Sequence, residues 1–223
     1  MKSVLITGGG GRLGAAIAKR LAADGWRVVL ADKDAIAAER AAKTVGGDAV
    51  AMTLDVTDIA AVEKTVAQLG PFAGLVTAAG GRFGADDGAF TESDPTTWRA
   101  IVDVHLKGVL NSCRSVLPGM IAAKAGAIVN IAAIEGLRGD PRGAVFSAAK
   151  GGVIVLTQTL VRECRPHGIR VNALLPGNPD SLAKTKAPDD STDVAEMIAF
   201  LMSNRAPRTM GATLDVTAGW ALH

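Results

Sequence analysis

The sequence predicts an α/β fold in which a doubly wound parallel sheet of seven strands carries helices on both faces. Short apolar runs recur along the 223 residues, and longer stretches with helical spacing of apolar residues separate them. Most of these runs are continuously apolar rather than alternating, which is typical of parallel strands covered on both sides. Alternating strands and helices require crossover connections, and these favour a parallel sheet. The chain has no internal repeat and no linker, so we expect a single domain over residues 1–223.

The strands are expected where short runs of aliphatic and β-branched residues occur. They are predicted at residues 4–7, 27–31, 49–54, 74–77, 127–131, 170–174 and 213–216.

Helices are expected in the intervals between these strands. Leu13, Ile17 and Leu21 form an apolar stripe at four-residue spacing directly after the first strand. A second stripe, after an N-cap at Thr57 or Asp58, predicts a helix before the fourth strand. Two further helices are predicted at residues 144–164 and 193–202.

The longest helical pattern begins at Asp94, a favourable N-cap, with Pro95 at the first helical position. We expect this helix to run through Trp98 to about residue 117, where Pro118 ends it.

Composition narrows the range of partners. The formal net charge is +2 and the basic residues are scattered, which argues against nucleic acid or an anionic membrane as the main partner. The opening apolar run is too short for a signal peptide, and no apolar run approaches the length needed to cross a bilayer. Two cysteines in helical segments, Cys113 and Cys164, cannot build a disulfide framework, and no residues have metal-ligand spacing. We therefore expect a cytoplasmic protein without a metal site.

A glycine-rich turn, TGGGGRLG at residues 7–14, lies where the first strand meets the first helix. Glycines at this position let the backbone approach a pyrophosphate, and the helix N-terminus supplies N–H donors. Asp32 ends the second strand, where a carboxylate would bind the hydroxyls of the adenosine ribose. The sequence thus indicates a dinucleotide site.

These motifs resemble the short-chain dehydrogenase/reductase family, and the resemblance covers nearly the whole chain. The family's TGxxxGxG motif matches here with Arg12 in place of its middle glycine, and LDVTD resembles the segment that meets the adenine. LVTAAG resembles the family's NNAG strand end, and GIRVNALLPG resembles the sixth strand, which flanks the nicotinamide. The resemblance implies a Rossmann-like fold, a homodimer or homotetramer, and a dinucleotide held by the following residues: Thr7, Gly8, Gly11, Arg12, Leu13, Gly14, Asp32, Asp55, Val56, Ala79, Gly80, Lys150, Pro176, Gly177 and Ser181.

The choice between NAD and NADP depends on the charges around the ribose. Asp32 would accept hydrogen bonds from both ribose hydroxyls and repel a 2′-phosphate, whereas Lys33 and Arg12 offer positive charge nearby. We give Asp32 the greater weight and expect NAD.

Four positions carry the chemistry in the family that this chain resembles. A serine polarises the carbonyl, a tyrosine transfers the proton, a lysine binds the nicotinamide ribose and an asparagine holds a water. The matching positions here are Ala133, Phe146, Lys150 and His105, so only the lysine is retained. Lys150 and His105 remain the candidate catalytic residues, because imidazole can donate a proton near neutral pH.

Two further pairs of residues are candidates for a chemical role. Arg138 and Arg142 could hold an anionic substrate, but we favour a solvated loop as the explanation for them. Cys164 and His167 resemble an ordinary helix end, and we assign them a structural role.

Two functions therefore remain open. The first is an NAD(P)-dependent oxidoreductase that acts weakly on a small carbonyl or alcohol substrate. The second is a non-catalytic dinucleotide-binding sensor, scaffold or partner subunit.

Overall fold

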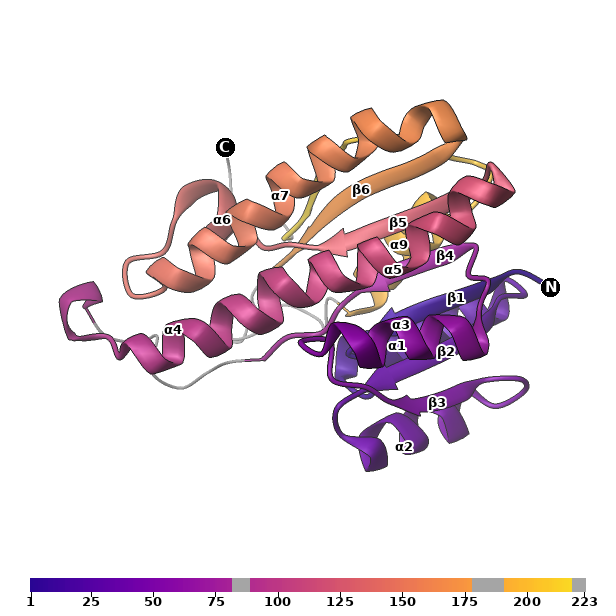
Figure 1. Ribbon diagram of the computed structural model, residues 1–223, viewed down its shortest axis with the longest axis horizontal. Helices are drawn as coiled ribbons and strands as arrows, with labels where there is room; N and C mark the ends of the chain where they lie inside the picture. Colours follow the sequence, from indigo (N-terminus) through magenta and orange to yellow (C-terminus); the bar gives the residue numbers. More distant parts are fainter. Residues whose placement is uncertain (82–88, 178–190, 218–223) are drawn as a thin grey trace.

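The computed structural model describes residues 1–81, 89–177 and 191–217. Seven strands form one sheet in the order β3-β2-β1-β4-β5-β6-β7, and every neighbouring pair is parallel (Figure 1). All seven predicted strands are present, so the predicted doubly wound sheet is confirmed. Their bounds are β1 Ser3–Thr7, β2 Arg27–Asp32, β3 Val50–Thr53, β4 Gly74–Thr77, β5 Gly126–Ile131, β6 Ile169–Pro176 and β7 Thr213–Val216.

Helices cover both faces of this sheet. On one face lie α1 (Arg12–Ala23), α2 (Ala35–Val45) and α9 (Ser191–Met202), and on the other lie α3 (Ile59–Leu69), α5 (Gly108–Ala123) and α7 (Ala144–Cys164). Strand β1 contributes side chains to the hydrophobic cores on both faces of the sheet, since Leu5 packs into one core while Val4 and Ile6 pack into the other. The two cores hold the strand ends in fixed register.

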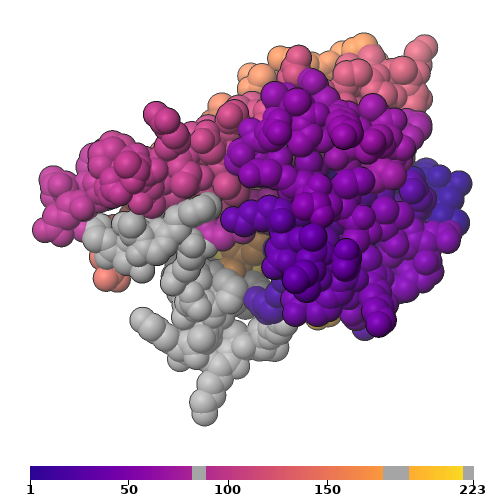
Figure 2. All heavy atoms as spheres, turned by 60° about the horizontal axis from the view of Figure 1, so that its bottom comes forward, coloured from indigo at the N-terminus to yellow at the C-terminus, as the bar shows by residue number. Residues whose placement is uncertain are grey.

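Shorter elements lie beyond the carboxyl ends of the strands. The 3₁₀ turn η1 (Phe90–Glu92) and the helix α4 (Pro95–Val102) project from the body of the molecule, and α4 lies beside α7 (Figure 1). The short helix α6 (Glu135–Arg138) packs against α7. Figure 2 shows the same projection as spheres. Another 3₁₀ turn, η3 (Arg165–His167), lies at the opposite end of the sheet, where it joins α7 to the amino end of β6. Asp94 caps α4 by accepting a hydrogen bond from the Thr96 N–H at 2.9 Å, as expected from the sequence.

The prediction that Pro118 ends the long helix was wrong. One π-helical turn, η2 (Asp103–Lys107), separates α4 from α5, and α5 then continues past Pro118 to Ala123. Pro118 removes one backbone donor, but it lines a groove on the outer side of α5 rather than the buried side. The helix continues because Val116 and Met120, on either side of the proline, are buried in the core, and this packing offsets the lost hydrogen bond.

The expectation that no segment has membrane-spanning length was also wrong. Among the described residues, one helical stretch, 144–167, is long and apolar enough by length and composition, with a mean hydropathy of 1.5. One side of it is buried against the sheet, with Val153 and Ile154 in the core.

Arg170 ties β6 to the end of α9. It is buried, and burial lowers the pKa of its guanidinium. Its guanidinium donates to carbonyls that close the C-terminal end of that helix, which satisfies acceptors that helix ends leave open. The acceptors are Leu201, Met202, Ser203 and Ala206.

Candidate functional site

The dinucleotide candidates gather along the carboxyl edge of the sheet. Thr7 ends β1, Asp32 ends β2, and Pro176 ends β6. Ala79 and Gly80 follow β4, next to β1 in the sheet, where the direction of the strand order reverses. Ligands bind doubly wound sheets outside the carboxyl ends of the strands at such a switch point.

The glycines of the loop serve two different purposes. Gly8 has φ 69°, and a Cβ there would lie 2.5 Å from the Ala78 carbonyl oxygen. A Cβ on Gly14 would collide with the Gly8 carbonyl oxygen. A Cβ on Gly11 would meet only that same oxygen, at 3.4 Å. Gly8 and Gly14 are therefore required by the protein's own packing, whereas Gly11 leaves its surroundings open for a ligand.

Helix α1 begins without a side-chain cap. Its N-cap is Gly11, whereas α2, α3 and α4 are capped by the carboxylates of Asp34, Asp58 and Asp94. The N–H groups of a first helical turn need an acceptor, and a phosphate is a suitable one. The first turn, with Arg12 and Leu13, fits the pyrophosphate of a dinucleotide.

Asp32 is fixed by backbone donors on both sides. One carboxylate oxygen accepts from the Gly10 N–H and the other from the Asp34 N–H, each at 3.0 Å. This orientation ties the carboxylate to the glycine-rich loop, which is where a ribose bound at that loop would lie.

Asp55 and Val56 come directly after β3. The Asp55 carboxylate accepts from the Thr57 N–H at 2.9 Å and the Thr57 hydroxyl at 2.8 Å, and these bonds lower the pKa of Asp55. The Val56 carbonyl accepts from Asn111 Nδ2 at 2.8 Å, which anchors this segment to α5.

The remaining candidates lie at the ends of β1, β4 and β6. The Ala79 N–H donates to the Thr7 hydroxyl at 3.4 Å, and the Gly177 N–H donates to the Val216 carbonyl at 3.1 Å. Ser181 lies outside the described residues.

The four chemical positions form a partly buried cluster. The Phe146 and His105 rings meet edge to face, with centroids 4.9 Å apart. Lys150 Nζ lies 5.7 Å from the Phe146 ring centroid and donates to the Ile131 carbonyl at 2.9 Å. Ala133 is buried two residues beyond β5. At the two positions where the family has a serine and a tyrosine hydroxyl, this chain has the methyl group of Ala133 and the phenyl ring of Phe146.

His105 is a neutral group in this cluster. Burial, together with the charge of Lys150, lowers its pKa to about 4, against a hydrogen bond with Gly81 that raises it. His105 Nε2 lies 3.0 Å from the Gly81 carbonyl oxygen, so this nitrogen carries the proton. Near pH 7 the imidazolium form is scarce, which argues against His105 as the proton donor.

Lys150 is buried beside a carboxyl group. Desolvation lowers its pKa to about 8, and the charge of Glu135 opposes that shift. Gly136 brings α6 against α7, since a Cβ there would lie 2.7 Å from the Gly151 nitrogen. Glu135 itself is 9% exposed. In the sequence, Glu135 is a single carboxylate between Ile134 and Gly136. This pattern does not predict that its charge acts on Lys150.

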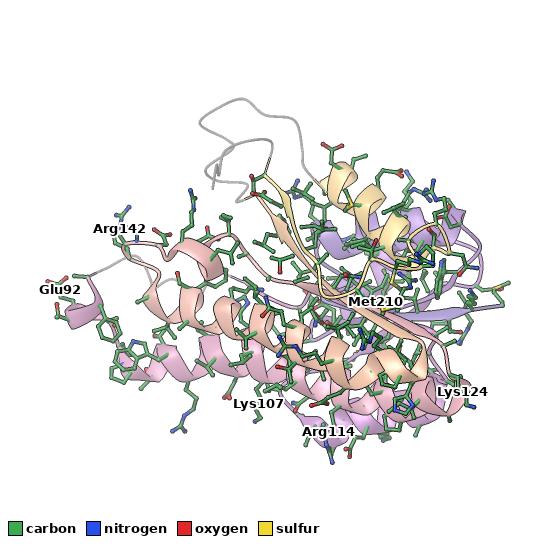
Figure 3. The ribbon with its side chains drawn as sticks, turned by 90° about the horizontal axis from the view of Figure 1, so that it is seen from above. Glu92, Lys107, Arg114, Lys124, Arg142 and Met210 are labelled. Atoms are coloured by element: carbon green, nitrogen blue, oxygen red, sulfur yellow. The ribbon has the colours of Figure 1, made fainter. Side chains whose placement is uncertain are left out.

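Other candidates lie away from this cluster. Arg142 is exposed at the outer end of the molecule, with its side chain directed outward (Figure 3). Burial raises the pKa of the Cys113 thiol to about 12 and also raises the pKa of the Cys164 thiol, so both are poor nucleophiles. Across the described ranges, no group of three His, Cys, Asp or Glu side chains could hold a metal ion.

Comparison with known proteins agrees with this geometry. A family model described as short chain dehydrogenase matches residues 2–192. The chain belongs to the short-chain dehydrogenase family. It is therefore related to oxidoreductases, and its fold is the one found in that family.

Individual relatives span nearly the whole chain. The 3-oxoacyl-(acyl-carrier-protein) reductase FabG of Staphylococcus aureus is 32% identical and aligns with 98% of this chain and 97% of its own. The Xanthobacter autotrophicus protein named inactive 2-(S)-hydroxypropyl-CoM dehydrogenase 2 is 34% identical, over 87% of this chain and 95% of its own. A Brucella melitensis 3-ketoacyl-(acyl-carrier-protein) reductase, crystallised with NADH, has a TM-score of 0.90 at 31% identity and covers 99% of this chain and 98% of its own.

Proposed function

We propose that this protein binds NAD(H) at the carboxyl edge of its sheet and acts as a weak oxidoreductase on a small carbonyl or alcohol substrate. When bound, the nicotinamide would supply or accept a hydride. The loop from Thr7 to Gly14 would hold the pyrophosphate, Asp55 and Val56 would border the adenine, and Lys150 would bind the nicotinamide ribose. The observation that carries the proposal is the uncapped α1 N-terminus beside the fixed carboxylate of Asp32.

A preference for NAD(H) over NADP(H) follows from the Asp32 carboxylate. Two unit charges about 4 Å apart repel by about 1 kcal/mol even in a water-like dielectric, and a 2′-phosphate carries nearly two charges. We expect NADH to bind at least about tenfold more tightly than NADPH. Two relatives of known structure support this choice, since they were crystallised with NADH and NAD.

Calorimetric titration with both dinucleotides tests the proposal. Asp32→Ala should lose the preference by binding NADPH more tightly. Asp48→Ala is the matched control, because Asp48 is an exposed carboxylate that precedes β3 and lies away from the carboxyl edge. Tighter binding of NADPH than NADH by the unaltered protein would overturn the NAD assignment.

The weak activity follows from the two apolar positions. A reduced carbonyl leaves a developing negative charge on oxygen, which a serine hydroxyl and a tyrosine hydroxyl would normally stabilise. Ala133 and Phe146 have no group that can do so. A positioned acid typically contributes about a hundred- to ten-thousandfold in rate, so slow turnover is expected without it.

The alternative is a dinucleotide-binding sensor, scaffold or partner subunit without turnover. The same two apolar positions favour it, and one relative that is 34% identical carries the word inactive in its name.

We also propose that the protein is a homodimer or homotetramer. An apolar groove runs between α5 and α7, and Leu110, Ile121 and Val155 are exposed on these helices. Burying this surface against a second copy would remove it from water. The groove is lined by Leu110, Cys113, Arg114, Leu117, Pro118, Ile121, Leu156 and Leu160.

A further inference from the structure

A contact between two glycines places Glu135 beside Lys150. A Cβ on Gly136 would lie 2.7 Å from the Gly151 nitrogen, and a Cβ on Gly151 would lie 3.1 Å from the Gly136 carbonyl oxygen. The two backbones therefore touch at the residues that directly follow Glu135 and Lys150. This contact between α6 and α7 brings a nearly buried carboxyl group and a buried ammonium group into one cluster.

The Glu135 carboxylate acts on Lys150 without binding it. Within residues 1–81, 89–177 and 191–217, no ion pair joins the two side chains, and the carboxylate accepts no hydrogen bond. Its charge nevertheless raises the pKa of Lys150, against the desolvation that lowers this pKa to about 8. A direct ion pair would occupy the N–H donors of the ammonium, whereas a charge at a distance leaves them available.

Lys150 therefore keeps donors for a ligand. An ammonium group has three N–H donors, and one of them is directed to the Ile131 carbonyl oxygen at 2.9 Å. The Phe146 ring, with its centroid 5.7 Å from Nζ, has no oxygen that could accept another.

Glu135 is the charged neighbour that matters for this ammonium. The elements packed against α7 include η2, α4, α6, β5 and β6. Their charged or titratable residues are Asp103, His105 and Lys107 on η2, Arg99 on α4, Glu135 and Arg138 on α6, and Arg170 on β6. His105 is neutral near pH 7, and Arg99, Lys107 and Arg138 are exposed. In the described part of this set, the charge that acts on Lys150 is that of Glu135.

We propose that Glu135 is a positioning residue that acts through Lys150: as a distant counterion, it keeps the ammonium protonated and leaves its donors to the nicotinamide ribose. The inference rests on the proposed function, since the ribose belongs to NADH bound at the same edge of the sheet. A protonated lysine donates stronger hydrogen bonds than a neutral amine. Loss of the Glu135 charge should therefore weaken NADH binding at the pH values where Lys150 loses its proton.

The protonation of Lys150 can be followed directly in the dinucleotide-free protein. In a nuclear magnetic resonance titration, the signal of its ε-carbon, assigned by its absence from Lys150→Arg, should have a midpoint at about pH 8. Glu135→Gln keeps the size of the side chain without its charge, and we expect it to lower this midpoint by about one pH unit or more. Glu163→Gln is the matched control, because Glu163 is an exposed carboxylate near the other end of α7. An unchanged midpoint in Glu135→Gln would overturn the inference.

The affinity for NADH as a function of pH tests the consequence. With midpoints of about 8 and about 7, Glu135→Gln should bind NADH about threefold more weakly than the unaltered protein at pH 7.5, about eightfold more weakly at pH 8.5, and nearly equally at pH 6.5. Glu135→Asp restores the charge and should recover most of the loss. A loss of the same size at every pH would indicate a structural role alone and would overturn the inference.

The two titrations separate the levels of failure. If NADH binds the unaltered protein and Glu135→Gln equally at every pH, Glu135 does not act through Lys150, and the proposed dinucleotide site stands. If the unaltered protein does not bind NADH, the proposed function itself is wrong.

Discussion

Restoring two hydroxyl groups to the chemical site should convert this protein into a better carbonyl reductase. Phe146→Tyr places a phenol on a ring whose centroid lies 5.7 Å from the Lys150 ammonium. At about 6 Å and an effective dielectric constant of about 20, a unit charge stabilises a phenolate by about 3 kcal/mol. This lowers the pKa of the new phenol by about 2, from about 10 to about 8. The phenol would then titrate close to the working pH, as an efficient general acid must.

Ala133→Ser adds the second group, a hydroxyl that can polarise the carbonyl. We expect the double variant to reduce a generic diketone or keto ester about ten- to a thousandfold faster than the unaltered protein. Each single variant should gain less, because both hydroxyls act on one oxygen and their effects are not additive. The rate should fall as the pH rises through about 8, where the phenol loses its proton.

Loss of NADH absorbance provides the assay for both variants. Phe200→Tyr is the matched control, since Phe200 also lies beneath a cation, with Arg205 5.6 Å from its ring centroid, but on α9. If the double variant binds NADH normally and is no faster than its parent, the site does not place a carbonyl against the cofactor. The non-catalytic alternative would then be preferred.

Three further predictions concern stability, cofactor binding and assembly. The pKa of His105 is about 4 in the folded protein and 6.5 for an unperturbed histidine, so between these pH values the unfolded chain binds more protons and stability falls on acidification. Urea unfolding at pH 7.5 and pH 5 should show a loss of about 2 kcal/mol that shrinks in His105→Asn; an equal loss in the variant would contradict the burial argument. Gly11→Ala should keep the melting temperature but weaken NADH binding, whereas Gly14→Ala should lower the melting temperature through its clash with the Gly8 carbonyl; equal melting temperatures would refute this division of the glycines. Light scattering at micromolar concentration should show a dimer or tetramer that Leu110→Glu weakens, and a monomeric unaltered protein would count against the groove as an interface.

The sheet and the dinucleotide edge could be predicted because their signals are local. Each strand is a continuous apolar run, and the glycine-rich turn and Asp32 have fixed positions relative to strands. Helix α2 gave no comparable signal, since its buried residues are only Ala38 and Ala41. Pro118 misled because the packing of Val116 and Met120 against the sheet holds α5 together through the proline, and the sequence pattern does not show how strongly that packing opposes the lost hydrogen bond.

The state of the chemical site could be predicted only in part. The residue types at positions 105, 133, 146 and 150 follow from the sequence, but the protonation states of His105 and Lys150 do not. The neutrality of His105 arises from burial and from Lys150, and the pKa of Lys150 depends on burial and on Glu135. These effects come from contacts of α7 with η2 and α6, and η2 lies far from the other two elements in the chain.

We propose that this protein keeps a working dinucleotide site and has lost the groups that assist carbonyl reduction. One experiment tests both halves in a single sample: NADH is titrated to saturation by fluorescence, and a generic diketone is then added. We expect saturable binding of NADH, followed by oxidation of NADH that is little faster than the uncatalysed background. Rapid oxidation on addition of the diketone, or no saturable binding of NADH, would contradict it.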